Sequence, residues 1–339
     1  MQYNNRAGAE NYKDIKLCFI IRIMLNVRYR AINIPRFLRF LGRGYLRRGS
    51  FRTCPPSFYD IWRISLFLRT FADIIRYPNK MAKVHQSLKI TAKKALNAGY
   101  YLLRLRPVDG VLPAGIQPGQ FVEIKTPENA SLLRRPISIH FVDYRLNELS
   151  LLVRAVGAGT EAICAVNEGG VLDLVLPLGN GFTCDFDKES TVVLVGGGVG
   201  VAPLLYQAAV LAGKGLKIKM VYGARTSGEL VVADAFEPYC DVEITTDDGS
   251  AGLRGRVTDS LTFREGLREA AMVQCCGPAP MMKAVAAVCR EAGIPCEVSL
   301  ENMMACGLGA CLCCVEKTVK GNVCVCTDGP VFNIKELIW

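Results

Sequence analysis

Histidine is nearly absent from the sequence. The 339 residues include 2 His, beside 15 Cys and 32 Gly. With only His85 and His140 available, mechanisms that need a histidine base and metal sites that need several histidines are almost excluded. The chemistry must therefore be supplied by something that the chain binds.

Long apolar runs are also missing. The best one, residues 17–27, is interrupted by Arg22 and is much shorter than the roughly 20 residues that a membrane-spanning helix needs. No longer apolar core followed by a small-residue cleavage site is visible, so a secretory signal is not indicated. We therefore expect no membrane segment and a cytoplasmic protein.

Acidic residues are scarce in the first 80 positions. There 16 Lys and Arg face 4 Asp and Glu, a net charge of +12, whereas the remaining 259 residues have 25 basic and 27 acidic residues. The part that we expect to fold is thus close to neutral, and nucleic acid is not an expected partner. We interpret residues 1–80 as a basic, Arg-rich extension that is disordered or spurious, with Met81 as the candidate true start.

Cysteine is abundant but unevenly placed. Six of the 15 Cys lie within 21 residues, namely Cys306, Cys311, Cys313, Cys314, Cys324 and Cys326. Such crowding at one end of the chain is typical of a metal site in a reducing compartment rather than of an extracellular disulfide framework.

Two patterns succeed each other after residue 80. Short β-prone runs separated by turn residues predict an antiparallel β barrel over residues 81–185. Buried apolar runs that alternate with helix-like stretches then predict a parallel-sheet α/β domain over residues 186–292. Residues 293–339 carry the crowded cysteines and are expected to form a small C-terminal module.

The segment from Thr191 to Pro203 reads as a strand that runs into a glycine-rich loop. Its order is Gly-x-Gly-x-x-Pro across Gly198, Gly200 and Pro203. Glycines let the backbone approach an anionic group, and the free amides of the following helix suit a pyrophosphate. No acidic residue ends the next strand at Tyr222 to hold a ribose, so the loop departs from the usual dinucleotide fingerprint. A different kind of nucleotide-binding family is indicated.

The barrel region carries a second motif. It consists of Arg134-Arg-Pro-Ile-Ser-Ile139, followed by Leu152-Val-Arg154 and Val156-Gly-Ala-Gly-Thr160. A guanidinium beside a proline-fixed strand can clamp a phosphate, while a hydroxyl and strand amides can contact a flavin ring. Each piece alone is ordinary, but together and ahead of the glycine loop they resemble the ferredoxin-reductase-type flavoproteins. That resemblance implies FAD on the barrel and a nicotinamide nucleotide on the α/β domain.

The cysteine spacing narrows the metal site. Cys306, Cys311, Cys314 and Cys326 follow C-x4-C-x2-C-x11-C on a glycine-rich backbone, and the first three have plant-type ferredoxin spacing. A structural zinc site usually has paired C-x2-C knuckles, and only one such pair is found here. The pattern therefore favours a [2Fe-2S] cluster. Cys313 and Cys324 are left as spares, and a ligand swap stays open.

This order of flavin barrel, nicotinamide domain and cluster resembles the electron-transfer subunits of two-protein, NAD-dependent dihydroorotate dehydrogenases of bacterial pyrimidine synthesis. The resemblance covers residues 82–339. It implies that the cluster ligands are Cys306, Cys311, Cys314 and Cys326. It implies that the FAD contacts are Arg135, Pro136, Ile137, Ser138, Leu152, Val153, Arg154, Gly159 and Thr160. For NAD, the glycine loop and family position suggest Gly197, Gly198, Gly200, Pro203, Cys276 and Gly277.

The resemblance also implies a role. Nicotinamide exchanges two electrons and a cluster exchanges one, whereas flavin can do both, so FAD is expected between them. Dihydroorotate would be oxidised on FMN in a separate catalytic subunit, and the two proteins would form a heterotetramer of two plus two. No residue of this chain is expected to be a catalytic acid, base or nucleophile. The choice of NAD over NADP is a family inference, because Arg225 could meet a 2′-phosphate.

Two other functions stay open from the sequence. An NAD(P)-linked flavin/iron-sulfur subunit of a sulfide dehydrogenase or ferredoxin:NADP oxidoreductase looks similar over the same span, although in that group an aspartate can replace one cluster cysteine. The other is a non-enzymatic, zinc-stabilised binding module, and the intact flavin motif speaks against it.

A chain that begins at Met81 is expected to keep both cofactors and the same rate of NADH-dependent dye reduction as the full chain. All the motifs lie after this residue, and the loss of a net +12 should make the protein slightly acidic. Absorption spectra and dye-reduction rates of the two purified proteins make the comparison. A shorter chain that failed to fold would show that the extension packs against the body.

Overall fold

The structure is a computed structural model that describes residues 83–127 and 130–339. These residues belong to the unit Asn79–Trp339. The predictions for residues 1–80 lie outside the described residues. Within the described part, no helix is both long enough and apolar enough to span a membrane.

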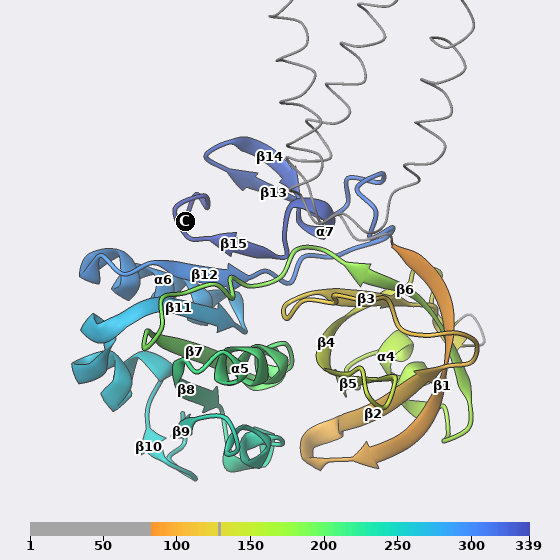
Figure 1. The fold of residues 1–339 in the computed structure, drawn as a ribbon, viewed down its shortest axis with the longest axis horizontal. Coiled ribbons are helices and arrows are strands. Elements are labelled where there is room, and N and C mark those ends of the chain that lie inside the picture. Colours follow the sequence, from red (N-terminus) through yellow and green to blue (C-terminus); the bar gives the residue numbers. More distant parts are fainter. Residues whose placement is uncertain (1–82, 128–129) are drawn as a thin grey trace, which may run out of the picture. The chain divides into compact units, whose positions relative to one another are not determined.

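Six strands close into an antiparallel barrel with the order β1-β2-β5-β4-β3-β6 (Figure 1). Inward-facing aliphatic side chains fill it, among them the fully buried Leu103, Leu105 and Leu151. The strands are β1 (Val84–Ala95), β2 (Tyr100–Pro107), β3 (Phe121–Ile124), β4 (Arg135–Asp143), β5 (Glu148–Arg154) and β6 (Val171–Leu178). The short helix α4 (Ala158–Ala165) follows β5 and packs Ile163 into the barrel core. The predicted barrel is confirmed.

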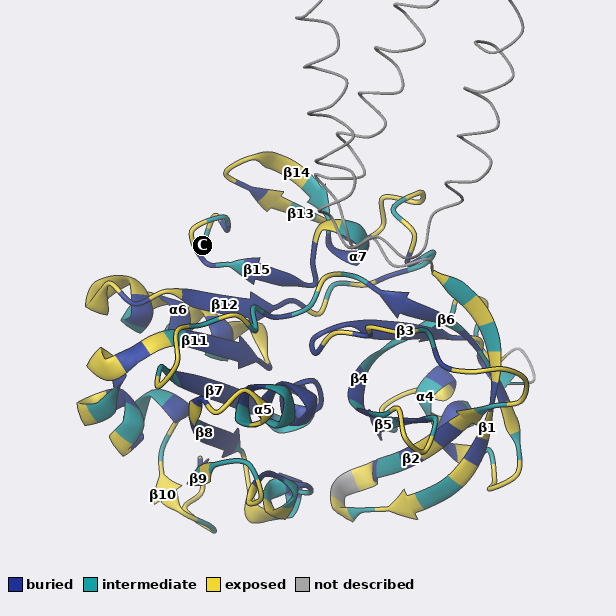
Figure 2. Cartoon of the chain, viewed as in Figure 1, coloured by how far each residue is buried: buried dark blue, intermediate teal, exposed yellow. Residues whose placement is uncertain are grey.

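A seven-stranded sheet of order β10-β9-β8-β7-β11-β12-β15 follows the barrel. Its strands are β7 (Thr191–Gly197), β8 (Lys217–Ala224), β9 (Asp241–Thr246), β10 (Leu253–Arg254), β11 (Ala270–Cys276), β12 (Cys296–Ser299) and β15 (Val331–Asn333). Helices α5 (Leu204–Gly213) and α6 (Ala279–Ala292) follow β7 and β11. All its neighbouring pairs are parallel except β12–β15, and Figure 2 shows β7, β11 and β12 largely buried, as parallel strands require.

The predicted α/β sheet is therefore confirmed, and it extends beyond residue 292. Strands β12 and β15 both come from the segment that the sequence suggested as a separate module. The rest of that segment is the cysteine loop, the hairpin of β13 (Val315–Thr318) and β14 (Gly321–Cys324), and the short helix α7 (Val325–Asp328). The turn after β6 anchors it: the Asn180 side chain donates to the carbonyls of Thr327 (3.2 Å) and Asp328 (2.9 Å).

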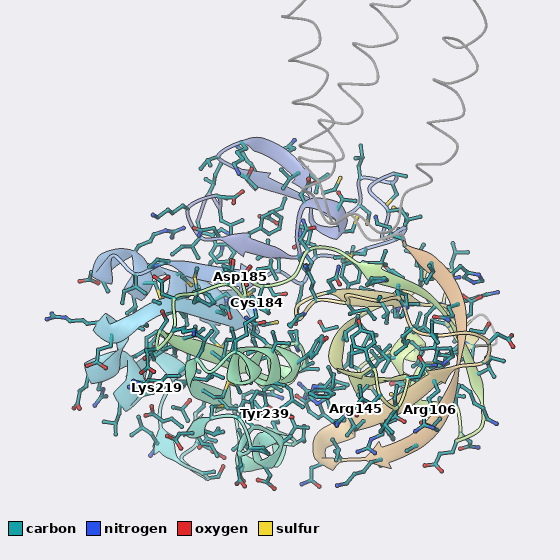
Figure 3. The ribbon with its side chains drawn as sticks, in the orientation of Figure 1. Arg106, Arg145, Cys184, Asp185, Lys219 and Tyr239 are labelled. Carbon is teal, nitrogen blue, oxygen red and sulfur yellow. The ribbon has the colours of Figure 1, made fainter. Side chains whose placement is uncertain are left out.

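A buried polar network holds the connection between β6 and β7. The hydroxyl of Thr183 donates to the Glu297 carboxylate of β12 at 2.5 Å, and Gln207 of α5 donates to the Thr183 carbonyl at 2.9 Å. Cys184 and Asp185 lie on the same connection (Figure 3), and the Cys184 thiol is 3.2 Å from Gln207 Oε1. Because these buried groups are hydrogen-bonded, the network orders the link between barrel and sheet.

His140 joins the two parts directly. Its Nδ1 on β4 lies 2.7 Å from the carbonyl oxygen of Ala202, just before α5. A carbonyl only accepts, so the neutral ring carries its proton on Nδ1 and donates. Beside this contact, Tyr206 of α5 donates to the Ile116 carbonyl at 3.1 Å and packs edge-on against Phe141.

Burial lowers the pKa of His140 to about 4, although its hydrogen bond to Ala202 acts in the opposite direction. An unfolded histidine titrates near pH 6.5, so the unfolded chain binds the proton first as the pH falls. The contribution of neutral His140 to the stability of the fold is therefore fully present above about pH 6.5 and is lost as the pH falls toward 4. Between pH 7 and pH 5, this titration should lower the free energy of unfolding by about 2 kcal/mol. A His140→Asn variant keeps a hydrogen-bond donor but does not titrate, so it should not show this loss. Urea unfolding at both pH values measures this difference, and parallel losses in the two proteins would contradict it.

Candidate cofactor and nucleotide sites

A cavity of about 410 Å³ lies across the carboxyl ends of the central strands. It is lined by the glycine-rich turn after β7, the ends of β8 and β9, the turn between β11 and α6, and Arg154 from the barrel. Strand order reverses at β7, because β8 lies on one side of it and β11 on the other. Nucleotides bind at such switch points in open α/β sheets. This cavity is therefore the candidate nucleotide site.

The cavity contains four of the six residues predicted for NAD, namely Gly197, Gly198, Gly200 and Gly277. A Cβ on Gly200 would lie 2.5 Å from the Cys276 carbonyl oxygen, so glycine lets the two turns meet. Pro203 and Cys276 do not line the cavity. Pro203 is the N-cap of α5, and Cys276 is 2% exposed, with the pKa of its thiol raised by burial. Their predicted contacts with NAD remain predictions.

A buried carboxylate that the sequence did not single out lines the cavity. Glu229, at the end of the 3-10 turn η4 (Ser227–Glu229), is 7% exposed. Its Oε1 is 2.5 Å from Arg225 Nη2 and 3.0 Å from Arg154 Nη2. Hydrogen bonding from Arg225, reinforced by the charges of both arginines, lowers the pKa of Glu229. Glu229 thus links the barrel to the sheet as an ionised group.

The predicted flavin motif comes together on the barrel at Arg135 and α4. The Arg135 guanidinium donates to Ser131 Oγ at 2.5 Å, and its Nε lies only 2.5 Å from where a Cβ on Gly159 would be. Any side chain at Gly159 would therefore displace the guanidinium. Thr160 Oγ1 accepts from the Val156 amide at 3.1 Å and orders the turn before α4. A guanidinium at a helix N-terminus is a suitable arrangement for a diphosphate.

The other residues predicted for FAD divide into three groups. Pro136, Ile137 and Ser138 follow Arg135 on β4 and are partly exposed. Leu152 and Val153 are buried on opposite faces of β5, so only their main chain is available to a ligand. Arg154 lies in the nucleotide cavity and pairs with Glu229. The arrangement fits FAD contacts along β4 and α4 more directly than at Arg154.

The four predicted cluster cysteines lie close together in two pairs. Cys306 is within hydrogen-bonding reach of Cys311, and Cys326 is within reach of Cys314. Two pairs of thiols fit two iron atoms better than one zinc ion.

Backbone amides support these sulfurs. The Leu308 amide donates to Cys306 Sγ at 3.3 Å, the Gly309 amide to Cys326 Sγ at 3.2 Å, and the Cys326 amide to Cys314 Sγ at 3.4 Å. Burial opposes ionisation of Cys306, but the amide hydrogen bonds prevail and lower its pKa to about 6. These amides therefore favour the thiolate of Cys306, the form that binds iron. Cys313 is exposed and Cys324 is half-buried.

Glu123 lies beneath the cysteine loop. It is fully buried on β3, and neither carboxylate oxygen has a hydrogen-bond partner among the described residues. Arg134 donates to its main-chain carbonyl at 3.3 Å, and a Cβ on Gly307, where φ is +64°, would lie 2.8 Å from Glu123 Cγ. Burial raises the pKa of Glu123 to about 7, with Cys306 also raising it and the two arginines Arg134 and Arg135 lowering it. The flavin motif and the cysteine loop therefore lie on the same side of the barrel.

Two family models match the chain. Residues 301–338 match the iron-sulfur cluster binding domain of dihydroorotate dehydrogenase B, and residues 194–287 match the oxidoreductase NAD-binding domain. The electron transfer subunit of dihydroorotate dehydrogenase B (NAD(+)) from Desulforamulus reducens is 40% identical over 66% of this chain and 87% of its own length. The corresponding Streptococcus pneumoniae subunit is 36% identical over 73% of this chain and 96% of its own length.

The chain belongs to this family of electron transfer subunits. It is thus an oxidoreductase subunit, as the sequence predicted, rather than a zinc-stabilised binding module. A solved NADH-dependent reduced ferredoxin-NADP oxidoreductase is 32% identical, with a TM-score of 0.66 over 74% of this chain and 90% of that one. The FAD/NAD-binding domain of a Vibrio cholerae nitric oxide dioxygenase, 23% identical with a TM-score of 0.52 over 62% of this chain and 94% of that one, shares the fold.

Replacing Arg135 by Ala is expected to lower FAD affinity at least about tenfold while leaving the iron content unchanged. The variant loses a charge-assisted contact worth about 1.5–3 kcal/mol, and the cysteine loop does not depend on this side chain. FAD and iron per chain, measured after purification, together with FAD titration of the flavin-free protein, test the assignment. Unchanged FAD affinity would contradict it.

Proposed function

We propose that this chain transfers electrons between NAD and an FMN-containing catalytic subunit of dihydroorotate dehydrogenase, in the cytoplasm and within a heterotetramer of two plus two. Its cofactors are FAD and a [2Fe-2S] cluster, and the pathway is pyrimidine synthesis. The observation that carries the proposal is the position of Glu123. Arg134, beside the flavin motif, contacts it from one direction, and Gly307 of the cysteine loop packs on it from another. Two cofactors held by these neighbouring segments would be close enough to exchange electrons.

The residues that would hold FAD are those along β4 and at the start of α4. Arg135 neutralises diphosphate charge, Gly159 leaves room for the guanidinium, and the partly exposed Ile137 and Ser138 offer an apolar surface and a hydroxyl. Bound there, FAD supplies the conversion between two-electron exchange with nicotinamide and one-electron exchange with a cluster.

The residues that would hold the cluster are the two cysteine pairs. Cys314 and Cys326 are buried, whereas Cys311 is exposed. One pair therefore anchors the site in the core of the module, and the other leaves an edge accessible to a partner protein. The amides of Leu308 and Gly309 donate to the sulfurs and offset their negative charge.

The nucleotide site needs no acid or base from the protein. Gly197, Gly198 and Gly200 bring backbone close to a pyrophosphate, and Gly277 opens the turn on the other side of β7. The chain's part in the reaction is then to bind and orient its cofactors, with no side chain assigned to proton transfer.

Replacing Cys314 by Ser is expected to remove the cluster and leave the flavin. Serine exchanges a soft thiolate for a poor hydroxyl ligand. The variant should keep FAD and NADH-dependent dye reduction but lose iron, the visible absorption of the cluster and electron transfer to the FMN-bearing subunit. Cys313→Ser, at the exposed neighbour, is the matched control and should resemble the unmodified protein in every assay.

Equal iron loss from both variants would contradict the assignment of Cys314 as a ligand and Cys313 as a spare. Stoichiometric zinc without iron after anaerobic purification would overturn the electron-transfer proposal. Efficient electron exchange with ferredoxin, and none with the FMN-bearing subunit, would favour the ferredoxin-NADP oxidoreductase function that the 32% identical structure represents.

A further inference from the structure

The nucleotide site has an acid where the sequence showed none. Strand β8 follows the glycine loop and ends at Ala224, and Arg225 comes next. In doubly wound sheets this strand end faces the adenosine ribose: an acidic residue there binds the 2′-hydroxyl of NAD, and a nearby arginine accommodates the 2′-phosphate of NADP. The fold brings Glu229 back onto Arg225, so that both kinds of residue meet at this position.

The Arg225 guanidinium is already engaged. Its Nη2 donates to Glu229 Oε1 at 2.5 Å and its Nε to Oε2 at 3.4 Å. Arg154 shares Oε1 at 3.0 Å, and the Tyr222 hydroxyl holds the Glu229 carbonyl at 3.1 Å. A phosphate on the remaining N–H groups of Arg225 would share the guanidinium with the buried Glu229 carboxylate, which other contacts keep in place, and would lie beside its negative charge. Oε2, with one long hydrogen bond, still has capacity to accept a hydroxyl proton.

The charges beside Arg225 also oppose a 2′-phosphate. Asp247, at the end of β9, lines the cavity beside Arg225, and the whole lining has three arginines against three carboxylates: Arg154, Arg225, Arg256, Glu229, Asp247 and Glu301. A 2′-phosphate would add about two negative charges next to Glu229 and Asp247.

A neutral polar group fits the same end of the cavity. Thr245 lines it from β9 and is fully buried, and its hydroxyl has no hydrogen-bond partner among the described residues. Such an orphaned hydroxyl needs a partner, and a sugar hydroxyl or a base edge supplies one without adding charge.

We propose that Glu229 determines the nucleotide specificity of the site: by neutralising the charge of Arg225 and placing a carboxylate beside it, Glu229 selects a dinucleotide with a free 2′-hydroxyl and rejects one with a 2′-phosphate. The inference rests on the proposed function, because it assumes that the cavity binds a nicotinamide nucleotide. Glu229 acts through Arg225 and takes no part in electron transfer.

The test measures binding rather than turnover. Calorimetric titrations of the cofactor-loaded protein with NAD⁺, NADP⁺, 5′-AMP and adenosine 2′,5′-bisphosphate give four dissociation constants. Glu229→Gln should strengthen the binding of NADP⁺ relative to NAD⁺, and of adenosine 2′,5′-bisphosphate relative to 5′-AMP, by at least about tenfold. Adding Arg225→Gln to that variant should abolish the gain, since the released guanidinium is its cause.

Glu237→Gln is the matched control, because it removes one exposed carboxylate from the same domain outside the cavity. It should leave all four constants unchanged. If Glu229→Gln fails to fold, Asp247→Asn replaces it and should shift the preference in the same direction by about threefold.

The inference is overturned if Glu229→Gln discriminates as strongly as the unmodified protein, or if its gain survives the loss of Arg225. It is also overturned, with the proposed function intact, if the unmodified protein binds NADP⁺ as tightly as NAD⁺. An unmodified protein that binds neither dinucleotide would instead overturn the proposed function.

Discussion

The contact between the barrel and the seven-stranded sheet is the constraint on which every candidate site depends. The hydrogen bond from His140 to the carbonyl of Ala202 and the ion pair from Arg154 to Glu229 both cross it. The Tyr206 side chain completes the junction from α5. A shift at this junction would separate the barrel motif that is proposed to hold FAD from the cavity that is proposed to hold the nucleotide. Electron exchange tolerates little separation, so a rigid junction serves the function directly.

Two buried glutamates show how differently one residue type behaves in this fold. Glu229 has two arginines on its carboxylate, and these keep its pKa below the usual range despite burial. Glu123 has no partner on either oxygen, so burial dominates and raises its pKa to about 7. The first is a stable charge that can set specificity by electrostatics. The second lies under the cysteine loop, where an extra negative charge would oppose the thiolates, so its neutral form is the compatible one.

The cysteine module is smaller than its sequence span suggests. Strands β12 and β15 complete the sheet, and Asn180 of the barrel-to-sheet turn holds the backbone beside α7. Only the loop with Cys306, Cys311 and Cys314, the β13–β14 hairpin and α7 project beyond the sheet. This sharing of strands explains how a short segment presents four thiols in a defined arrangement without a large core of its own.

Local pattern in the sequence determined the barrel, the parallel strands and the order of the motifs, because alternation, apolar runs and turn residues act over a few neighbours. Spacing also predicted Cys306, Cys311, Cys314 and Cys326 as the set, and all four lie within one short stretch, where the fold forms two pairs from them. The sequence pattern could not identify residues that act through partners far away along the chain. Glu123 becomes significant only because Gly307, far along the chain, packs on it. Arg154, predicted as a flavin contact, has an ion pair with Glu229 that the sequence did not indicate. The sequence has no acidic residue at the end of β8, where one would bind the ribose. The fold supplies one, because a 3-10 turn brings Glu229 back to Arg225. Electrostatic pairing depends on distance in three dimensions, and only the tertiary structure decided it.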